Sequence, residues 1–264
     1  MQSKSKTAPS ARRIKSIPLY RIGDPVAEPT SAEHWAICTR ATPQGFTASA
    51  VSDAFLRLYR KAASKERHLT LIAPAPQPDA THTWGLQHFL TQDALSRGWL
   101  CAALRLSALC KVSLLLPQPA LPTDLPAAKE MIEGEMLSLY QSGTTFDDLL
   151  TLGVTLGTPA ALLDAARLCE EADFAVIDTD ALLRLSFASE PCSIPFEQML
   201  AYNDGAVLRL LEAGIDLLHR ARRFAAVSGR LANDPLFENS LLDVGADAVL
   251  RAPTSPSHTS AFYI

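Results

Sequence analysis

The sequence predicts an α/β protein folded as a (β/α)8 barrel, a closed ring of eight parallel strands with helices outside. Eight short apolar runs, many of them β-branched, alternate with amphipathic segments in which apolar residues recur every three or four positions. Eight such units in roughly 250 residues match the size of this fold. A doubly wound sheet is the alternative, but its first turn is expected to be rich in glycine, and RIGDPVAEP at 21–29 has one.

The expected strands are short apolar runs bounded by turn-forming residues. In chain order they are SIPLYRI (16–22), HWAICT (34–39), HLTLIA (68–73), KVSLLL (111–116), TLGVTL (151–156), ADFAVID (172–178), FAAVSG (224–229) and ADAVLR (246–251). The seventh run passes from small apolar residues into a polar turn, which is typical of a buried strand that opens onto a loop.

The expected helices are the amphipathic segments between these runs. In chain order they are 49–64, 93–109, 125–141, 159–172 and 205–223. The last one is the richest in leucine, with Leu208, Leu210, Leu211, Leu217 and Leu218. A barrel helix needs one apolar face toward the sheet, so a surplus of leucine predicts a second apolar face and a partner interface.

The first 15 residues differ in composition from the rest of the chain. They are rich in serine, carry five Lys or Arg residues and contain no Asp or Glu, whereas the whole chain has a net charge of −4. We therefore expect a disordered basic tail over 1–15 and a single barrel domain over 16–264, with an organelle transit peptide as the alternative for the tail. An acidic body argues against nucleic-acid binding, and no apolar run approaches the roughly 20 residues of a membrane span.

Cysteine usage indicates the cellular compartment. The five cysteines are odd in number and widely spaced, without a C-x-x-C pair. This pattern is typical of reduced thiols in the cytoplasm and gives no zinc-site spacing.

Polar residues that follow the strands are the candidates for chemistry, because barrel enzymes carry their sites at the carboxyl ends of strands. Asp178 and Asp180 follow the sixth run, and they could hold a cation or cap the next helix. Ser228 ends the seventh run as a potential nucleophile or a hydroxyl that satisfies the loop backbone. Arg230 could bind an anion or pair with a surface carboxylate.

Five segments resemble one family in the same order along the chain. IPLYRIGDPVAEP is similar to a first strand with an N-I-G-S-P turn, and RGWLCAALRLSALCKVSLLLPQP to R-x-Q-L-R-A-I-L-R-A-S-x-x-G-x-x-x-I-M-F-P-M. LGVTLGTPAALLDA resembles I-G-x-M-I-E-T-P-A-A, and EADFAVIDTDALLR resembles E-V-D-F-F-S-I-G-T-N-D-L-T-Q. GAVLRLLEAGIDLLHRARRFAAVSGRLANDPL resembles P-A-V-L-x-L-I-x-x-x-I-D-A-A-H-x-x-G-K-x-x-x-M-C-G-E-L-A-G-D.

These motifs belong to the phosphoenolpyruvate (PEP)-binding barrel of the PEP-utilising enzymes, and the chain resembles it from about residue 17 to residue 253. The family includes enzyme I of the bacterial phosphotransferase system, PEP synthase and pyruvate phosphate dikinase, of which enzyme I is the most similar. The matching residues are mostly scaffold: Pro117, Gly153, Pro159, Ala160, Ala161, Asp173, Phe174, Thr179 and Gly229.

The residues that the resemblance assigns to chemistry are substituted. Ser228 replaces the cysteine that donates a proton, and Arg230 replaces the glutamate two residues later. Gly157 and Ala181 stand where the family has its Mg²⁺-binding Glu and Asp, and Asp180 replaces the neighbouring Asn. The sequence thus lacks both metal-binding carboxylates, so we expect no Mg²⁺ cofactor, with Asp178 or Asp180 as weaker substitutes.

The arginines that bind phosphate in the family are altered as well. Ile72 occupies one position, Gln87 corresponds to the second, and Arg97 corresponds to a further arginine before the long helix of the fourth unit. PEP carries a phosphate and a carboxylate, so its site needs several cations. We expect a pseudoenzyme that acts through protein contact, with Arg97, Arg230 and Gln87 as the remaining candidate ligands.

The resemblance also implies a partner, because barrels of this family dimerise. We therefore expect a homodimer, or a heterodimer with an enzyme I-type protein. The alternative is a divergent phosphotransferase or lyase that uses Mg²⁺ and acts on PEP, pyruvate or a related small acid.

Overall fold

The computed structural model describes residues 14–22, 34–39, 47–60, 62–63, 65, 67–74, 84–187 and 194–251. Its eight strands form a closed parallel barrel in the order β1 to β8, with β8 pairing with β1. The strands are β1 (Lys15–Ile22), β2 (His34–Thr39), β3 (His68–Ile72), β4 (Lys111–Leu116), β5 (Thr151–Leu156), β6 (Phe174–Asp178), β7 (Phe224–Ser228) and β8 (Ala248–Arg251). The (β/α)8 prediction is confirmed, and the doubly wound alternative is wrong.

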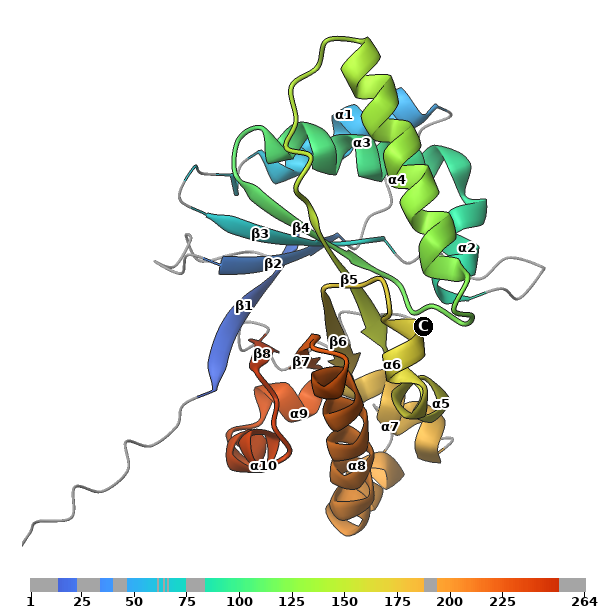
Figure 1. Ribbon diagram of the computed structural model, residues 1–264. Helices are drawn as coiled ribbons and strands as arrows, with labels where there is room; N and C mark the ends of the chain where they lie inside the picture. The colour runs from blue at the N-terminus through green and yellow to red at the C-terminus, as the bar shows by residue number, and fades with distance from the viewer. Residues whose placement is uncertain are drawn as a thin grey trace, which may run out of the picture.

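Helices surround the barrel, as Figure 1 shows, with α1 to α4 over one half and α5 to α10 over the other. They are α1 (Ala48–Tyr59), α2 (Gly85–Thr91), α3 (Asp93–Ser107), α4 (Asp124–Gln141), α5 (Pro159–Leu163), α6 (Ala165–Leu168), α7 (Thr179–Phe187), α8 (Ile194–Arg220), α9 (Arg230–Asn233) and α10 (Glu238–Asp243), with a short 3-10 helix η1 (Pro235–Phe237). Within the described chain, no helix has the length and apolar character needed to span a membrane.

Several boundaries differ from the sequence-based expectation, and the largest shift is in α8, which begins at Ile194 and not at residue 205. The segment 159–172 forms two short helices, because the backbone leaves the helical conformation at Asp164 (φ −111°, ψ 19°). The barrel begins earlier than expected, since Ile14 is buried and Lys15 starts β1. The rest of the expected tail, residues 1–13, lies outside the described residues.

Side chains that alternate along each strand separate the core into two clusters. Outward-facing residues such as Leu69, Leu114 and Val154 pack against the helices in one large cluster. Inward-facing residues fill the barrel in a smaller one: Ile17, Leu19, Ala36, Ile72, Leu115, Val176, Ala226, Ala248 and Leu250, with Phe174 packed against them. The interior is therefore a packed apolar plug that separates the two ends of the barrel.

Gly153 is needed inside this plug because its neighbour is large. A Cβ atom added at Gly153 would overlap the ring of Phe174, which faces it from the adjacent strand. These two residues belong to the set that matches the family motifs, so that part of the likeness concerns packing.

The leucine-rich helix α8 does not present the apolar surplus that the sequence predicts. Leu211 and Leu218 are fully buried, and Leu208, Leu210 and Leu217 are partly buried and pack against the core. For residues 205–218, whose side chains are described, the expectation of a second, solvent-facing apolar side is wrong. α8 contacts α5, α6 and β7, so several elements of the same chain share the leucines.

Candidate functional site

The ends of β6 and β7 bring most of the predicted site residues together. Asp178 and Ser228 are paired positions in the last register of these two strands. The chain then turns into α7 after Asp178 and into α9 after Ser228, so both turns lie at the carboxyl end of the barrel. This is the edge where barrels carry their sites.

Hydrogen bonds connect the two turns directly. The hydroxyl of Thr179 donates to the carbonyl of Ser228 at 2.7 Å, and the hydroxyl of Ser228 donates to the carbonyl of Ile177 at 3.3 Å. Thr179 and Ser228 are both fully buried. Ser228 therefore satisfies strand backbone, and a buried hydroxyl that already donates to a carbonyl is a poor nucleophile without a base to take its proton.

The two aspartates bind backbone amides at the starts of helices. Oδ1 of Asp178 accepts from the N–H of Asp180 at 3.0 Å and from the N–H of Ala181 at 3.4 Å, which caps α7. Oδ1 of Asp180 accepts from the N–H of Arg230 at 2.8 Å, at the first residue of α9. Both carboxylates are buried, and this geometry matches the capping interpretation of the sequence.

Gly229 closes this arrangement through its conformation. Its φ of +93° and ψ of −163° lie in a region that side chains rarely adopt. An added Cβ would lie 2.5 Å from Oγ1 of Thr179 and 3.1 Å from Oδ1 of Asp180. The turn after β7 thus fits against the turn after β6 only when residue 229 is glycine.

The end of β5 is joined to the preceding loop by Gln118. The backbone N–H of Gly157 donates to Oε1 of Gln118 at 2.7 Å, while Nε2 of Gln118 donates to Oγ1 of Thr158 at 3.3 Å. Thr158 also caps α5 by accepting from the N–H of Ala161. Where the resemblance implies a metal-binding carboxylate, this chain offers a buried glycine whose amide binds a neighbouring side chain.

The predicted phosphate ligands are dispersed. Ile72 is the last residue of β3, and its side chain faces the barrel interior as part of the apolar plug. Gln87 lies on α2, where its amide donates to Oδ1 of Asp124 at 3.2 Å. Asp124 in turn accepts from the N–H groups of Ala120 and Leu121, so this group of contacts holds the loop before α4.

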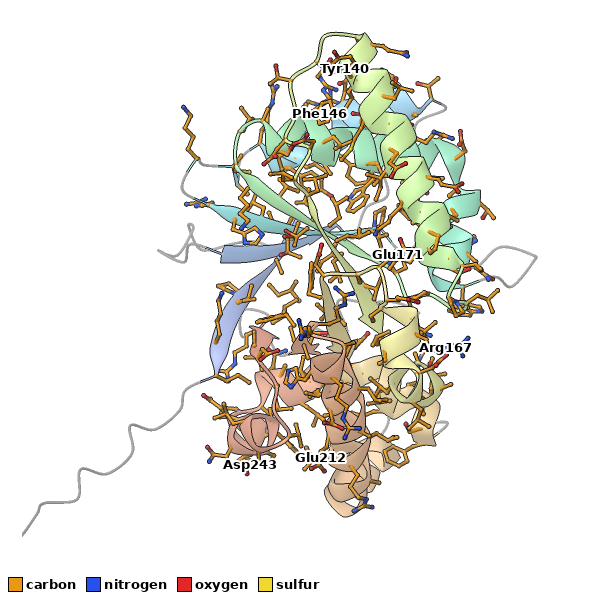
Figure 2. All side chains as sticks on the ribbon, in the orientation of Figure 1. Tyr140, Phe146, Arg167, Glu171, Glu212 and Asp243 are labelled. Atoms are coloured by element: carbon orange, nitrogen blue, oxygen red, sulfur yellow. The ribbon has the colours of Figure 1, made fainter. Side chains whose placement is uncertain are left out.

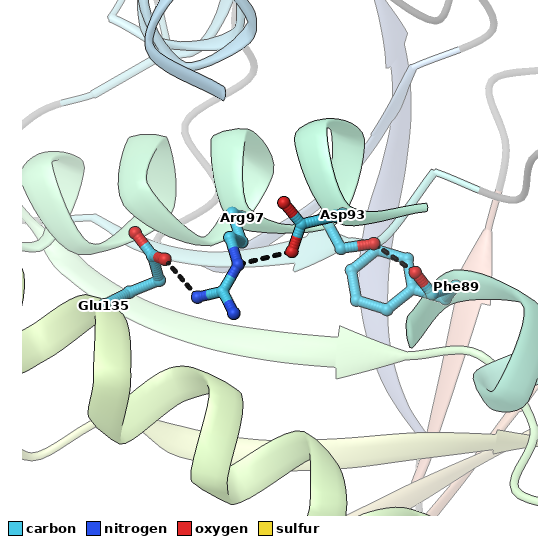
Figure 3. Close-up of polar contacts among 5 residues, drawn as sticks. Phe89, Asp93, Arg97 and Glu135 are labelled. Atoms are coloured by element: carbon cyan, nitrogen blue, oxygen red, sulfur yellow. Dashed lines mark hydrogen bonds and ion pairs between the residues drawn. The ribbon is translucent and has the colours of Figure 1, made fainter. Parts of the chain in front are cut away.

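Arg97 lies in the outer helix layer, as Figure 3 shows. Its guanidinium donates to Asp93 on the same helix at 2.5 Å and to Glu135 on α4 at 2.8 Å. These two carboxylates raise the pKa of Arg97. Its neighbour Ser96 donates to the carbonyl of Phe89 and ties α3 to α2. Arg97 therefore lies away from the turn that contains Ser228. The positive charge of Arg97 is balanced by the carboxylates of Asp93 and Glu135.

The two positions at which the resemblance implies Mg²⁺-binding carboxylates offer no side-chain oxygen in this chain. Mg²⁺ is held by carboxylate and carbonyl oxygens in octahedral geometry, and Gly157 and Ala181 have no side-chain oxygen to offer. The substitutes Asp178 and Asp180 each use an oxygen to accept a backbone N–H. Among the described residues, no group of three or more His, Cys, Asp or Glu side chains is arranged to hold a metal ion.

Sequence reasoning missed two residues that organise this edge, Gln118 and Thr179. Thr179 was recognised only as a scaffold match, and its bond to Ser228 depends on which strands are neighbours. Gln118 stands between two prolines in PQP, a setting that indicates a loop without indicating a contact to the next loop.

Comparison with known proteins agrees with the likeness seen in the motifs. The sequence profile described as "PEP-utilising enzyme, PEP-binding domain" matches residues 83–258, which include β4 to β8. The chain is 28% identical over 166 residues to a phosphoenolpyruvate-protein phosphotransferase of Latilactobacillus sakei, and 27% identical over 166 residues to that of Geobacillus stearothermophilus. Each match covers 63% of this chain and 29% of the relative, so the chain spans less than a third of the length of these relatives.

A solved structure extends the likeness to the whole barrel. An HpcH/HpaI aldolase from Desulfitobacterium hafniense DCB-2 superposes with a TM-score of 0.50, covering 91% of this chain and 86% of the aldolase. The sequence identity is 8%, so this likeness concerns the fold alone.

Proposed function

The chain belongs to the family of PEP-binding domains of PEP-utilising enzymes, and from that premise we propose that it is a pseudoenzyme of the family, acting by protein contact. Its partner is an enzyme I-type protein or a second copy of itself. The matched relatives are phosphoenolpyruvate-protein phosphotransferases, which makes a protein of that kind the first partner to test.

One observation carries the proposal. The positions that the resemblance assigns to metal and proton chemistry hold residues without the required groups, and the polar residues left between them bond to one another's backbone. Asp180 bonds to the N–H of Arg230, Thr179 bonds to Ser228, and Gln118 bonds to the N–H of Gly157. These contacts engage the polar groups with the backbone of neighbouring turns, which supports a structural role for the edge.

The electrostatics support the same conclusion. PEP binding needs several cations around a phosphate and a carboxylate. Ile72 is apolar and buried, and Arg97 is paired with Asp93 and Glu135. Losses at both the metal and the anion positions are what relaxed selection on turnover produces, while the packing residues Gly153 and Phe174 still match the family.

Calorimetry tests the loss of the PEP site. PEP is titrated to millimolar concentration with and without Mg²⁺, using a bacterial phosphoenolpyruvate-protein phosphotransferase as the positive control. We expect a saturable Mg²⁺-dependent heat from the control and none from this chain. A saturable Mg²⁺-dependent heat from this chain would refute the proposal and favour the alternative, a divergent phosphotransferase or lyase acting on PEP, pyruvate or a related small acid.

A further inference from the structure

The amino-terminal end of the barrel, opposite the edge discussed above, carries a polar cluster inside its mouth. Alternation along the strands turns Lys15, His68 and Lys111 inward, in phase with the plug residues Ile17, Ile72 and Leu115. The three residues begin β1, β3 and β4, and His68 and Lys111 are paired in register. This mouth is therefore lined by two ammonium groups and an imidazole.

Two hydroxyls form the floor of the mouth. Nε2 of His68 lies 2.7 Å from Oγ of Ser113, and Oγ of Ser113 donates to Oγ1 of Thr151 at 2.9 Å. Ser113 is almost fully buried and Thr151 is partly exposed, so this chain of groups runs from the plug toward solvent. Phe174 and Phe224 begin β6 and β7 at the same end and alternate in phase with the inward-facing Val176 and Ala226, so the β6–β7 side of the mouth is aromatic, whereas the side formed by β1, β3 and β4 carries the hydrogen-bonding groups.

No carboxylate of a described residue pairs with the two lysines of the mouth. Lys15 and Lys111 are exposed, and neither forms an ion pair with a carboxylate in the part of the chain that the structure describes. Burial first, and then the charges of Lys111 and Lys15, lower the pKa of His68 to about 4. His68 is therefore neutral at pH 7, and its ring experiences a positive field from both lysines.

We propose that this mouth binds a small oxyanion of the phosphate class, with Lys15 and Lys111 supplying the charge and His68, Ser113 and Thr151 lining the floor. The site is separate from the carboxyl-terminal edge and independent of the proposed function. The ligand is small because side chains fill an eight-stranded barrel and leave room only at its mouth. The net charge of −4 on the whole chain also disfavours large polyanions.

Titration calorimetry with inorganic phosphate tests the site at fixed ionic strength, with chloride as the background anion. We expect saturable binding in the millimolar range that weakens at least about tenfold in Lys111→Met and in Lys15→Met, because each removes one of two unpaired charges. Lys129→Met is the matched control, since Lys129 pairs with Glu171 outside the barrel. Its affinity for phosphate should equal that of the wild type.

A second measurement uses His68 as a reporter. A bound dianion offsets the two lysines, so saturating phosphate should raise the pKa of the His68 ring, followed by NMR of its Cε1 proton. Glycerol 3-phosphate is compared with inorganic phosphate: tighter binding of the ester assigns the site to phosphorylated metabolites, and tighter binding of the free ion assigns it to phosphate. Absent saturation, or equal affinity in Lys111→Met and wild type, would overturn the proposal.

Discussion

Oδ1 of Asp180 accepts a hydrogen bond of 2.8 Å from the backbone N–H of Arg230, and this contact joins the turns that follow β6 and β7. The resemblance places an amide and a carboxylate at these two positions, next to metal and substrate. Here the aspartate caps α9, and the arginine contributes its backbone. In this chain the contact ties the turn after β6 to the turn after β7.

Gly229 should be the most sensitive residue of this connection. Gly229→Ala adds a Cβ 2.5 Å from Oγ1 of Thr179 and forces a side chain into φ +93°, so we expect a loss of roughly 2 to 4 kcal/mol in the free energy of unfolding. Urea denaturation measures it. Gly134→Ala is the control, because Gly134 lies in α4 with no atom within 4 Å of an added Cβ. That variant should gain up to about 1 kcal/mol, and equal effects in both would contradict the argument.

The connection also shows what the sequence can predict. Strand order, the barrel and the clustering of residues 178–180 with residues 228–230 follow from alternation and from the rule that parallel strands end at one edge. The hydrogen-bond partners of these residues cannot be predicted in the same way. A carboxylate with the same sequence around it can bind a cation, cap a helix or pair with an arginine. The Asp180 contact becomes visible only when the distance to the Arg230 amide is known.

The positions of Arg97 and of the α8 leucines could not be predicted for a similar reason. Periodicity places Arg97 on a helix, but its partner Glu135 lies 38 residues later on α4, and that contact determines which carboxylates balance its charge. The leucines of α8 exceed what one sheet face needs, yet the helix also packs against α5 and α6. The number of apolar residues in a sequence pattern does not show how many helices and strands will pack against them.

Arg222 is a position where the fold can be stabilised. It follows α8 with φ +60°, and the N–H of Arg223 closes the helix by donating to the carbonyl of Leu218. Glycine is preferred at this place because it adopts a positive φ without steric cost. Arg222→Gly should therefore raise the free energy of unfolding by about 0.5 to 1 kcal/mol, measured by urea denaturation. A decrease would mean that the Arg222 side chain makes a stabilising contact that outweighs the strain.

His68 should make stability depend on pH. Its pKa is lowered from 6.5 to about 4 in the folded state, so between these values the unfolded chain binds a proton that the folded chain does not. Stability therefore falls as the pH decreases from about 6.5 to about 4. We expect about 1 to 2 kcal/mol from this residue, reduced by the solvent contact of the half-buried ring.

The pH effect is isolated by comparison with His68→Gln, which removes the titrating ring. Unfolding free energies of both proteins are measured at pH 7, 5.5 and 4. The advantage of the wild type over the variant should shrink as the pH falls, because only the wild type has this histidine. A difference that stays constant over the range would show that the pKa of His68 is close to its ordinary value.

The remaining prediction concerns assembly. Because the leucines of α8 pack against the core, we expect the partner interface on another surface. Tyr140 is 76% exposed and Leu137 is 58% exposed near the end of α4, and Leu149, 84% exposed, lies in the segment that leads to β5. Figure 2 shows Tyr140 at the tip of α4 with Phe146 on the segment that follows. Leu137 and Tyr140 are three residues apart and share one side of α4, and large apolar side chains exposed on one side of a helix favour a protein interface.

We therefore expect a dimer at micromolar concentration, alone or with an enzyme I-type protein, when mass is measured by light scattering. The double variant Leu137→Ser/Tyr140→Ser should shift the mass toward the 28.5 kDa of one chain, because it removes the apolar contact without touching the core. Leu236→Ser is the control: Leu236 is 85% exposed but lies in η1, on the other half of the barrel. A wild-type monomer, both alone and with the partner, would contradict the proposed contact function.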